Sequence, residues 1–170
     1  MSATWLADLP PGDTDWDRVA ALFPAAFEAV ADLQRAAWAS FDPVVLELAR
    51  LRTAQLLGFE AGLAVRSEAA RGAGLQEDKI SALADWPTSA LFSDAERACL
   101  ALTEQFVMDA NGVTDELVAT LLEHYSAADC HSFVNAVSAF ETFQRGCLTL
   151  GLGSSPEATW LGAPTREDPA

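Results

Sequence analysis

The sequence is poor in the residues that would indicate several common classes of protein. Its 170 residues include three cysteines, an odd and widely spaced set that matches neither a disulfide framework nor a zinc pattern: Cys99, Cys130 and Cys147. Valine and isoleucine are sparse, and no segment shows the sustained alternation of a β-strand. No apolar run approaches the roughly 20 residues that a spanning helix needs, and no secretory leader is evident. We therefore expect a cytoplasmic protein.

Basic residues are also scarce. The sequence has ten Lys and Arg residues against 25 Asp and Glu residues, which gives a formal net charge of −15. Lys79 is the single lysine. A chain this acidic is repelled by nucleic-acid phosphates and by anionic membrane surfaces. We therefore expect neither nucleic acid nor a membrane as a partner.

Apolar residues make up 51% of the chain, and alanine and leucine, both good helix formers, dominate them. This content suffices for one core, so we expect a single all-α domain over residues 1–170. Helical periodicity and capping signals predict helices over residues 16–23, 25–39, 43–57, 59–71, 76–83, 93–108, 115–125 and 126–150. In the second of these, helical spacing predicts a buried face made of Phe27, Val30, Leu33 and Ala37.

One stretch of the sequence resembles a known family. Residues 47–58 read ELARLRTAQLLG and resemble the helix that precedes the redox motif of alkylhydroperoxidase D-like proteins, the carboxymuconolactone decarboxylase family. Weaker matches follow in the family's order at ALADW (82–86), LFSDAERA (91–98), ALTE (101–104) and FETFQR (140–145). The resemblance covers residues 41–150. Residues 1–40 then form an N-terminal helical extension, and residues 151–170 an irregular tail.

The resemblance implies an alkylhydroperoxidase D-like bundle of about seven to eight helices. It also implies a homo-oligomer, whether dimer, trimer or hexamer. In the family, a Cys-x-x-Cys pair opens the helix after this segment, a His lies four residues beyond the pair, and a Glu comes from the preceding helix. Together these side chains reduce peroxides through a thiol–disulfide cycle.

This chain departs from that pattern at three of the four positions. Phe59 and Gly62 occupy the cysteine positions and Arg66 the histidine position, while only the acid, Glu47, is retained. Phenylalanine and glycine carry no thiolate, and arginine stays protonated at physiological pH, so it cannot relay protons as histidine does. We therefore expect that the peroxidase activity has been lost.

Two interpretations of the altered site remain open. Glu47 and Arg66 could form an ion pair with Phe59 as core, which would be a structural role. Alternatively, Phe59 and Gly62 could line a small-molecule pocket with Glu47 and Arg66 as its polar groups, Arg66 holding a carboxylate. The leading hypothesis is an oligomeric structural or ligand-binding protein without metal or cofactor.

Two enzymatic alternatives accompany this hypothesis. The first is a cofactor-free lyase or isomerase that acts on a small carboxylate, with Glu47 and Arg66 as its catalytic residues. The second is a thiol peroxidase that uses a remote cysteine. Free cysteines are usually buried, so a structural role is expected for all three.

Overall fold

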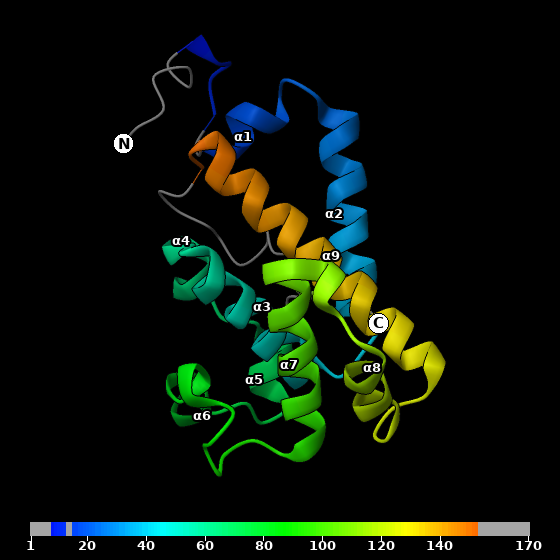
Figure 1. Ribbon diagram of the computed structural model, residues 1–170. Helices are drawn as coiled ribbons and strands as arrows, with labels where there is room; N and C mark the ends of the chain where they lie inside the picture. Colours follow the sequence, from blue (N-terminus) through cyan, green and yellow to red (C-terminus); the bar gives the residue numbers. More distant parts are fainter. Residues whose placement is uncertain (1–7, 13–14, 153–170) are drawn as a thin grey trace.

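The computed structural model describes residues 8–12 and 15–152, and these residues form helices and no strand, as Figure 1 shows. The all-α prediction is confirmed. Nine α-helices and two 3-10 helices are described: α1 (Asp15–Ala20), α2 (Pro24–Trp38), α3 (Pro43–Leu57), α4 (Glu60–Ala64), α5 (Glu68–Gly72), α6 (Glu77–Ser81), η2 (Leu83–Asp85), α7 (Asp94–Asp109), η3 (Ala110–Gly112), α8 (Asp115–Leu122) and α9 (Ala127–Leu150). The tail beyond Leu152 and the first seven residues lie outside the described residues.

Helix α3 is the centre of the fold. Nine of its fifteen residues are buried, so it is covered on most sides, chiefly by α7 and α9 and also by α4 and α5. Its limits are those predicted from the sequence. Asp42 caps its first turn by accepting from the backbone N–H groups of Val44 and Val45, and Gly58 ends it at φ 67°, a conformation that glycine adopts without strain.

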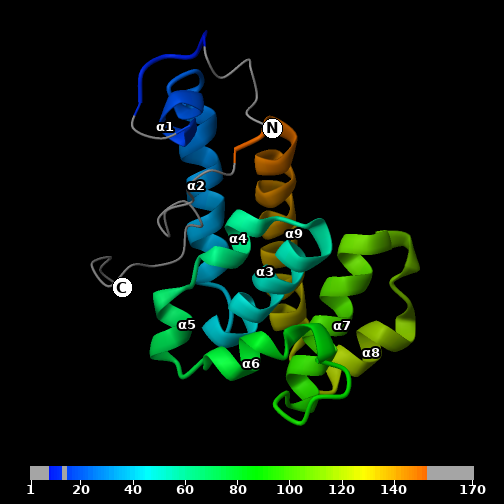
Figure 2. The ribbon, with the colours of Figure 1, turned by 90° about the vertical axis from the view of Figure 1, so that its left-hand side faces the viewer.

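Helix α2 packs along α9, and Figures 1 and 2 show α2 beside the upper part of α9, whose lower part runs into the wider body formed by α3 to α8. The predicted buried face of α2 is wrong at Val30 and Leu33, which are exposed. The face against α9 instead carries Gln34 and Trp38, and the Gln34 amide donates to the carbonyl of Ala139 at 2.9 Å. A polar side chain thus occupies a contact that the periodicity had assigned to apolar residues.

The predicted continuous helix over residues 59–71 is also wrong. The chain forms α4 and α5 instead, separated by Val65, which is extended at ψ 150°. Serine at position 67 then caps α5 by accepting from the N–H of Ala70. The break exists because side chains of α3 take over the backbone hydrogen bonds there, as described below.

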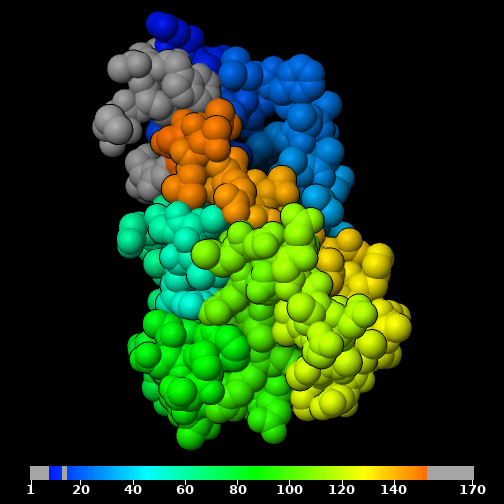
Figure 3. All heavy atoms as spheres, viewed as in Figure 1, coloured from blue at the N-terminus to red at the C-terminus, as the bar shows by residue number. Residues whose placement is uncertain are grey.

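The starts of α7 and α9 agree with the sequence. Ser93 and Glu96 form a reciprocal capping box at α7, and Ser126 and Asp129 form another at α9. The space-filling view in Figure 3 shows α7 and α8 on the surface of the lower body, below the end of α9. Among the described helices, none combines the length and apolar character required to cross a bilayer.

Candidate functional site

The two positions that the resemblance assigns to the cysteines of the redox motif, Phe59 and Gly62, pack against each other. Phe59 is buried, and its ring lies directly against Gly62. A Cβ atom added to Gly62 would lie 2.5 Å from Cδ1 of Phe59, closer than real Cβ contacts allow. The space that the motif's second cysteine would occupy is therefore taken up by the Phe59 ring.

Glu47 forms its ion pair with Arg50, one turn along α3. The two side chains are 0% and 1% exposed, and the Arg50 Nε and a terminal guanidinium nitrogen donate to the two Glu47 oxygens at 2.7 and 2.9 Å. Arg50 also donates to the carbonyls of Gly62 and Val65, at 2.8 and 3.0 Å. Glu47 accepts from the backbone N–H of Ser67 at 2.9 Å.

This buried network explains the break between α4 and α5. The carbonyls of Gly62 and Val65 and the N–H of Ser67 would otherwise be buried without partners, which is costly. Because Glu47 and Arg50 satisfy them, the chain can leave the helical path at Val65. Glu47, the acid that the resemblance assigns to the redox site, therefore stabilises the backbone between α4 and α5 in this chain.

Arg66 is partly buried, and none of its hydrogen bonds or ion pairs is to Glu47. Its Nε pairs with Glu77 of α6 at 3.2 Å, and its guanidinium also donates to the carbonyls of Leu63 and Val65. The expected Glu47–Arg66 ion pair is therefore wrong. The structure brings Phe59 and Gly62 together but does not bring Glu47 and Arg66 together.

The three cysteines are free and buried. Cys147 borders a small hollow of about 230 Å³ beside Phe59, at the ancestral motif's position, and burial raises the pKa of its thiol to about 12. Burial likewise raises the pKa of Cys99 to about 12. Such thiols stay protonated at physiological pH and are poor nucleophiles.

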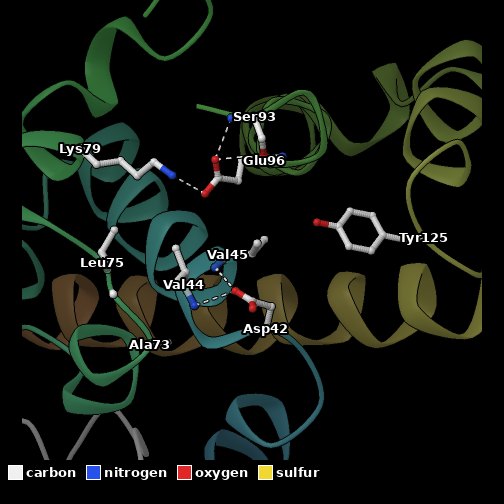
Figure 4. A pocket seen from close by; sticks show the side chains of 10 residues that line it. Asp42, Val44, Val45, Ala73, Leu75, Lys79, Ser93, Glu96 and Tyr125 are labelled. Atoms are coloured by element: carbon white, nitrogen blue, oxygen red, sulfur yellow. Dashed lines mark hydrogen bonds and ion pairs between the residues drawn. The ribbon is translucent and has the colours of Figure 1, made fainter. Parts of the chain in front are cut away.

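A larger pocket of about 560 Å³, here called the Lys79 pocket, lies at the other end of α3, where this helix begins (Figure 4). Its size is typical of sites for small molecules. It is lined by residues from the start of α3, the turn after α5, α6, the start of α7 and the turn before α9: Asp42, Val44, Val45, Ala73, Gly74, Leu75, Lys79, Ser93, Glu96 and Tyr125.

The polar groups of the Lys79 pocket are held by the helix caps. Glu96, which is 9% exposed, accepts from Ser93 through the capping box and from the Lys79 ammonium at 2.6 Å. The Lys79 ammonium also lies over the Phe92 ring, 5.6 Å from its centroid. In Figure 4, Val44 and Val45 lie between Asp42 and the ion pair of Lys79 and Glu96. The Tyr125 hydroxyl points towards the pocket.

The carboxylates make the pocket electrically negative. Burial by itself would raise the pKa of Glu96, but the hydrogen bonds from Lys79 and Ser93 and the charge of Lys79 outweigh burial and lower it. Glu96 is therefore ionised. Burial raises the pKa of the Tyr125 hydroxyl, and the neighbouring Cys99 thiol and the negative charges of Asp42 and Glu96 raise it further.

Sequence reasoning missed this pocket because its lining comes from five separate segments, none of which carries a motif. Two local observations point to it in retrospect. The single lysine of the chain lies in it, and both acids occupy capping positions at the starts of α3 and α7. Within the described part of the chain, no three His, Cys, Asp or Glu side chains gather as a metal site would require.

The fold and the sequence together define the class of protein. Residues 22–105 match the carboxymuconolactone decarboxylase family, and the match begins inside the segment expected to be an extension. The fold resembles the crystal structure of ATU0492 from Agrobacterium tumefaciens, a protein of unknown function described as a candidate AhpD antioxidant defence protein. The TM-score is 0.73 at 26% identity, over 82% of this chain and 96% of that one. The family match and the structural match together support the carboxymuconolactone decarboxylase, or AhpD-like, family for this chain.

A curated relative is the uncharacterized protein YnjA of Escherichia coli strain K12. It is 33% identical over 112 residues, which are 66% of this chain and 61% of YnjA. The matched segment thus spans about three fifths of that relative.

Proposed function

We propose that this protein is a non-redox member of its family that binds a small organic molecule in the Lys79 pocket and works as a homo-oligomer. The observation that carries the ligand-binding proposal is the pocket itself. It is about 560 Å³ in volume and combines an apolar surface of Val44, Val45 and Leu75 with a fixed ion pair. Ligand sites commonly combine apolar walls with a few well-placed polar groups.

The site chemistry supports the loss of peroxidase activity. No sulfur occupies either motif position, the Phe59 ring fills the space beside Gly62, and the Cys99 and Cys147 thiols resist deprotonation. The lyase alternative needs Glu47 and Arg66 to meet at one substrate. Since Glu47 is enclosed with Arg50 and Arg66 pairs with Glu77, the geometry of a single chain does not favour it.

A pocket-filling variant tests ligand binding. Ala73 is an exposed lining residue at the end of α5, so Ala73→Trp would fill the pocket without entering the core. Ala39→Trp is a matched control, because Ala39 ends α2 with nearly the same backbone angles and does not line the pocket. In a thermal-shift screen, ligands that bind the folded form raise the melting temperature. We expect compounds that stabilise the wild type and Ala39→Trp but not Ala73→Trp. If every stabilising compound acts equally on all three proteins, the pocket is not the ligand site.

The exposed side of α2 supports self-association. Four large apolar side chains of α2 and of the turn before it are exposed to solvent: Leu22 (51%), Phe23 (72%), Val30 (38%) and Leu33 (49%). We propose that a second copy of the chain covers these four exposed side chains, because the row they form begins and ends with a leucine. An antiparallel α2 would place Leu22 against Leu33 twice, as a two-fold interface requires.

Light scattering coupled to size exclusion tests this surface. Leu33→Glu should lower the mass towards that of a monomer, because it buries charge in the proposed contact. Met108→Glu is the control, since Met108 is equally apolar and 70% exposed but lies on α7. An unchanged mass for Leu33→Glu, or the same loss for both variants, would remove α2 as the interface.

A further inference from the structure

The hydrogen bonds inside the Lys79 pocket indicate which ligand chemistry it can accept. The N-termini of α3 and α7 both open onto the pocket, and helix N-termini ordinarily attract anions. Here each one is already occupied by a carboxylate of the chain. The Asp42 carboxylate accepts hydrogen bonds from the N–H groups of Val44 and Val45, and the Glu96 carboxylate accepts one from the N–H of Ser93. An incoming anion would find those donors engaged and two carboxylates beside it.

The cation of the pocket is engaged as well. The Lys79 ammonium is bound to Glu96 at 2.6 Å and stacked over Phe92, so its charge is largely neutralised within the protein. One ammonium and two carboxylates leave a formal charge of −1 at the pocket, within a chain of net charge −15. Such a field raises the local concentration of cations and lowers that of anions.

The Asp42 carboxylate can still accept hydrogen bonds from a ligand. Its hydrogen bonds to the α3 backbone use only one of its two oxygens, Oδ1. The pocket wall nearest to Asp42 in Figure 4 carries the side chain of Val45 and the ring of Tyr125, and an aromatic ring can accept an ammonium against its face. The neighbouring negative charges also raise the pKa of the Cys99 thiol and the Tyr125 hydroxyl, after burial, the largest cause.

We propose that the Lys79 pocket binds a small organic amine, whose ammonium pairs with Asp42 and whose apolar body packs on Val45 and Tyr125. This inference rests on the proposed function, because it specifies the ligand class of the same pocket. It differs from the small carboxylate expected from the sequence. That expectation relied on Arg66, which lies outside the pocket.

Three probes of similar shape test the charge preference: benzylamine, benzyl alcohol and benzoate, titrated by calorimetry near pH 7. We expect benzylamine to bind most tightly and benzoate not to bind. Raising the salt concentration should weaken benzylamine binding, because screening reduces the attraction between partly exposed charges.

Asp42→Asn is the decisive variant, because asparagine caps a helix as well as aspartate does and removes only the charge. It should weaken benzylamine binding about three- to tenfold, which corresponds to roughly one interaction between charges at a partly exposed site. Asp109→Asn is the matched control: Asp109 also caps a helical turn, at η3, and does not line the pocket.

Each other result overturns the proposal. Benzoate binding that is lost in Lys79→Gln would make this an anion site. Equal binding of benzylamine and benzyl alcohol, unaffected by Asp42→Asn, would show that charge does not matter. Binding of none of the three probes would also overturn the proposal, because benzylamine carries both the ammonium and the apolar body that the pocket is proposed to accept. All three results leave the Ala73→Trp screen intact as a test of ligand binding itself, so the two failures can be told apart.

Discussion

Glu47 offers the sharpest test of how this fold is held together. Its carboxylate is fully buried and accepts three hydrogen bonds, two from Arg50 and one from the backbone of Ser67. Glu47→Ala would remove both acceptor oxygens and with them all three hydrogen bonds. It would leave the Arg50 guanidinium buried with only two backbone carbonyls to bind.

Breaking a buried ion pair by removing one partner costs about 3–5 kcal/mol, because the remaining charge is uncompensated. Domains of ordinary stability unfold with about 5–15 kcal/mol, so the loss would be a large fraction of the total. In a domain of this size, each kcal/mol lowers the melting temperature by about 2–4 °C, which predicts a drop of roughly 6–20 °C.

Equilibrium unfolding in urea, together with calorimetry, would measure the loss. Glu141→Ala is the control, since Glu141 pairs with Arg145 on the surface of α9 at 2.8 Å, and exposed pairs of this kind contribute about 0.5 kcal/mol or less. If Glu47→Ala cost no more than Glu141→Ala, the structural role assigned to Glu47 would be refuted.

Three further predictions concern the packing and the titratable groups. Gly62→Ala should cost about 1–3 kcal/mol in urea unfolding, because its Cβ would overlap the Phe59 ring; no measurable loss would contradict that packing. At pH 8 the thiols should react slowly with a disulfide reagent in the native protein and completely in denaturant; rapid native labelling of Cys99 or Cys147 would contradict their raised pKa values. The lowered pKa of Glu96 stabilises the fold above its unfolded value of 4.5, and this stabilisation is lost as the pH falls through the lower folded value. The stability gap between wild type and Glu96→Gln should therefore shrink on acidification, and a gap that grows would reverse the sign.

The sequence predicted well the features that depend on neighbouring residues. The limits of α3 and the starts of α7 and α9 follow from residues within one turn of each other. The resemblance of α3 to a helix of the family could also be recognised, because it depends on a continuous segment of the sequence.

Features that depend on distant residues were not predictable in this way. The break at Val65 requires Arg50, fifteen residues earlier, to reach its carbonyl. The exposed side of α2 depends on which face meets α9, where Gln34 binds the backbone of Ala139 across 105 residues. The Lys79 pocket likewise gathers side chains from five segments that only the packed fold brings together.

We propose that redox chemistry is absent at the positions that the resemblance assigns to the Cys-x-x-Cys motif. Peroxide consumption with a dithiol donor, compared between the wild type and a variant with serine at positions 99, 130 and 147, tests this claim most directly. The two proteins should turn over peroxide at the same background rate. A wild-type rate well above background that is abolished by replacing one cysteine would contradict the claim.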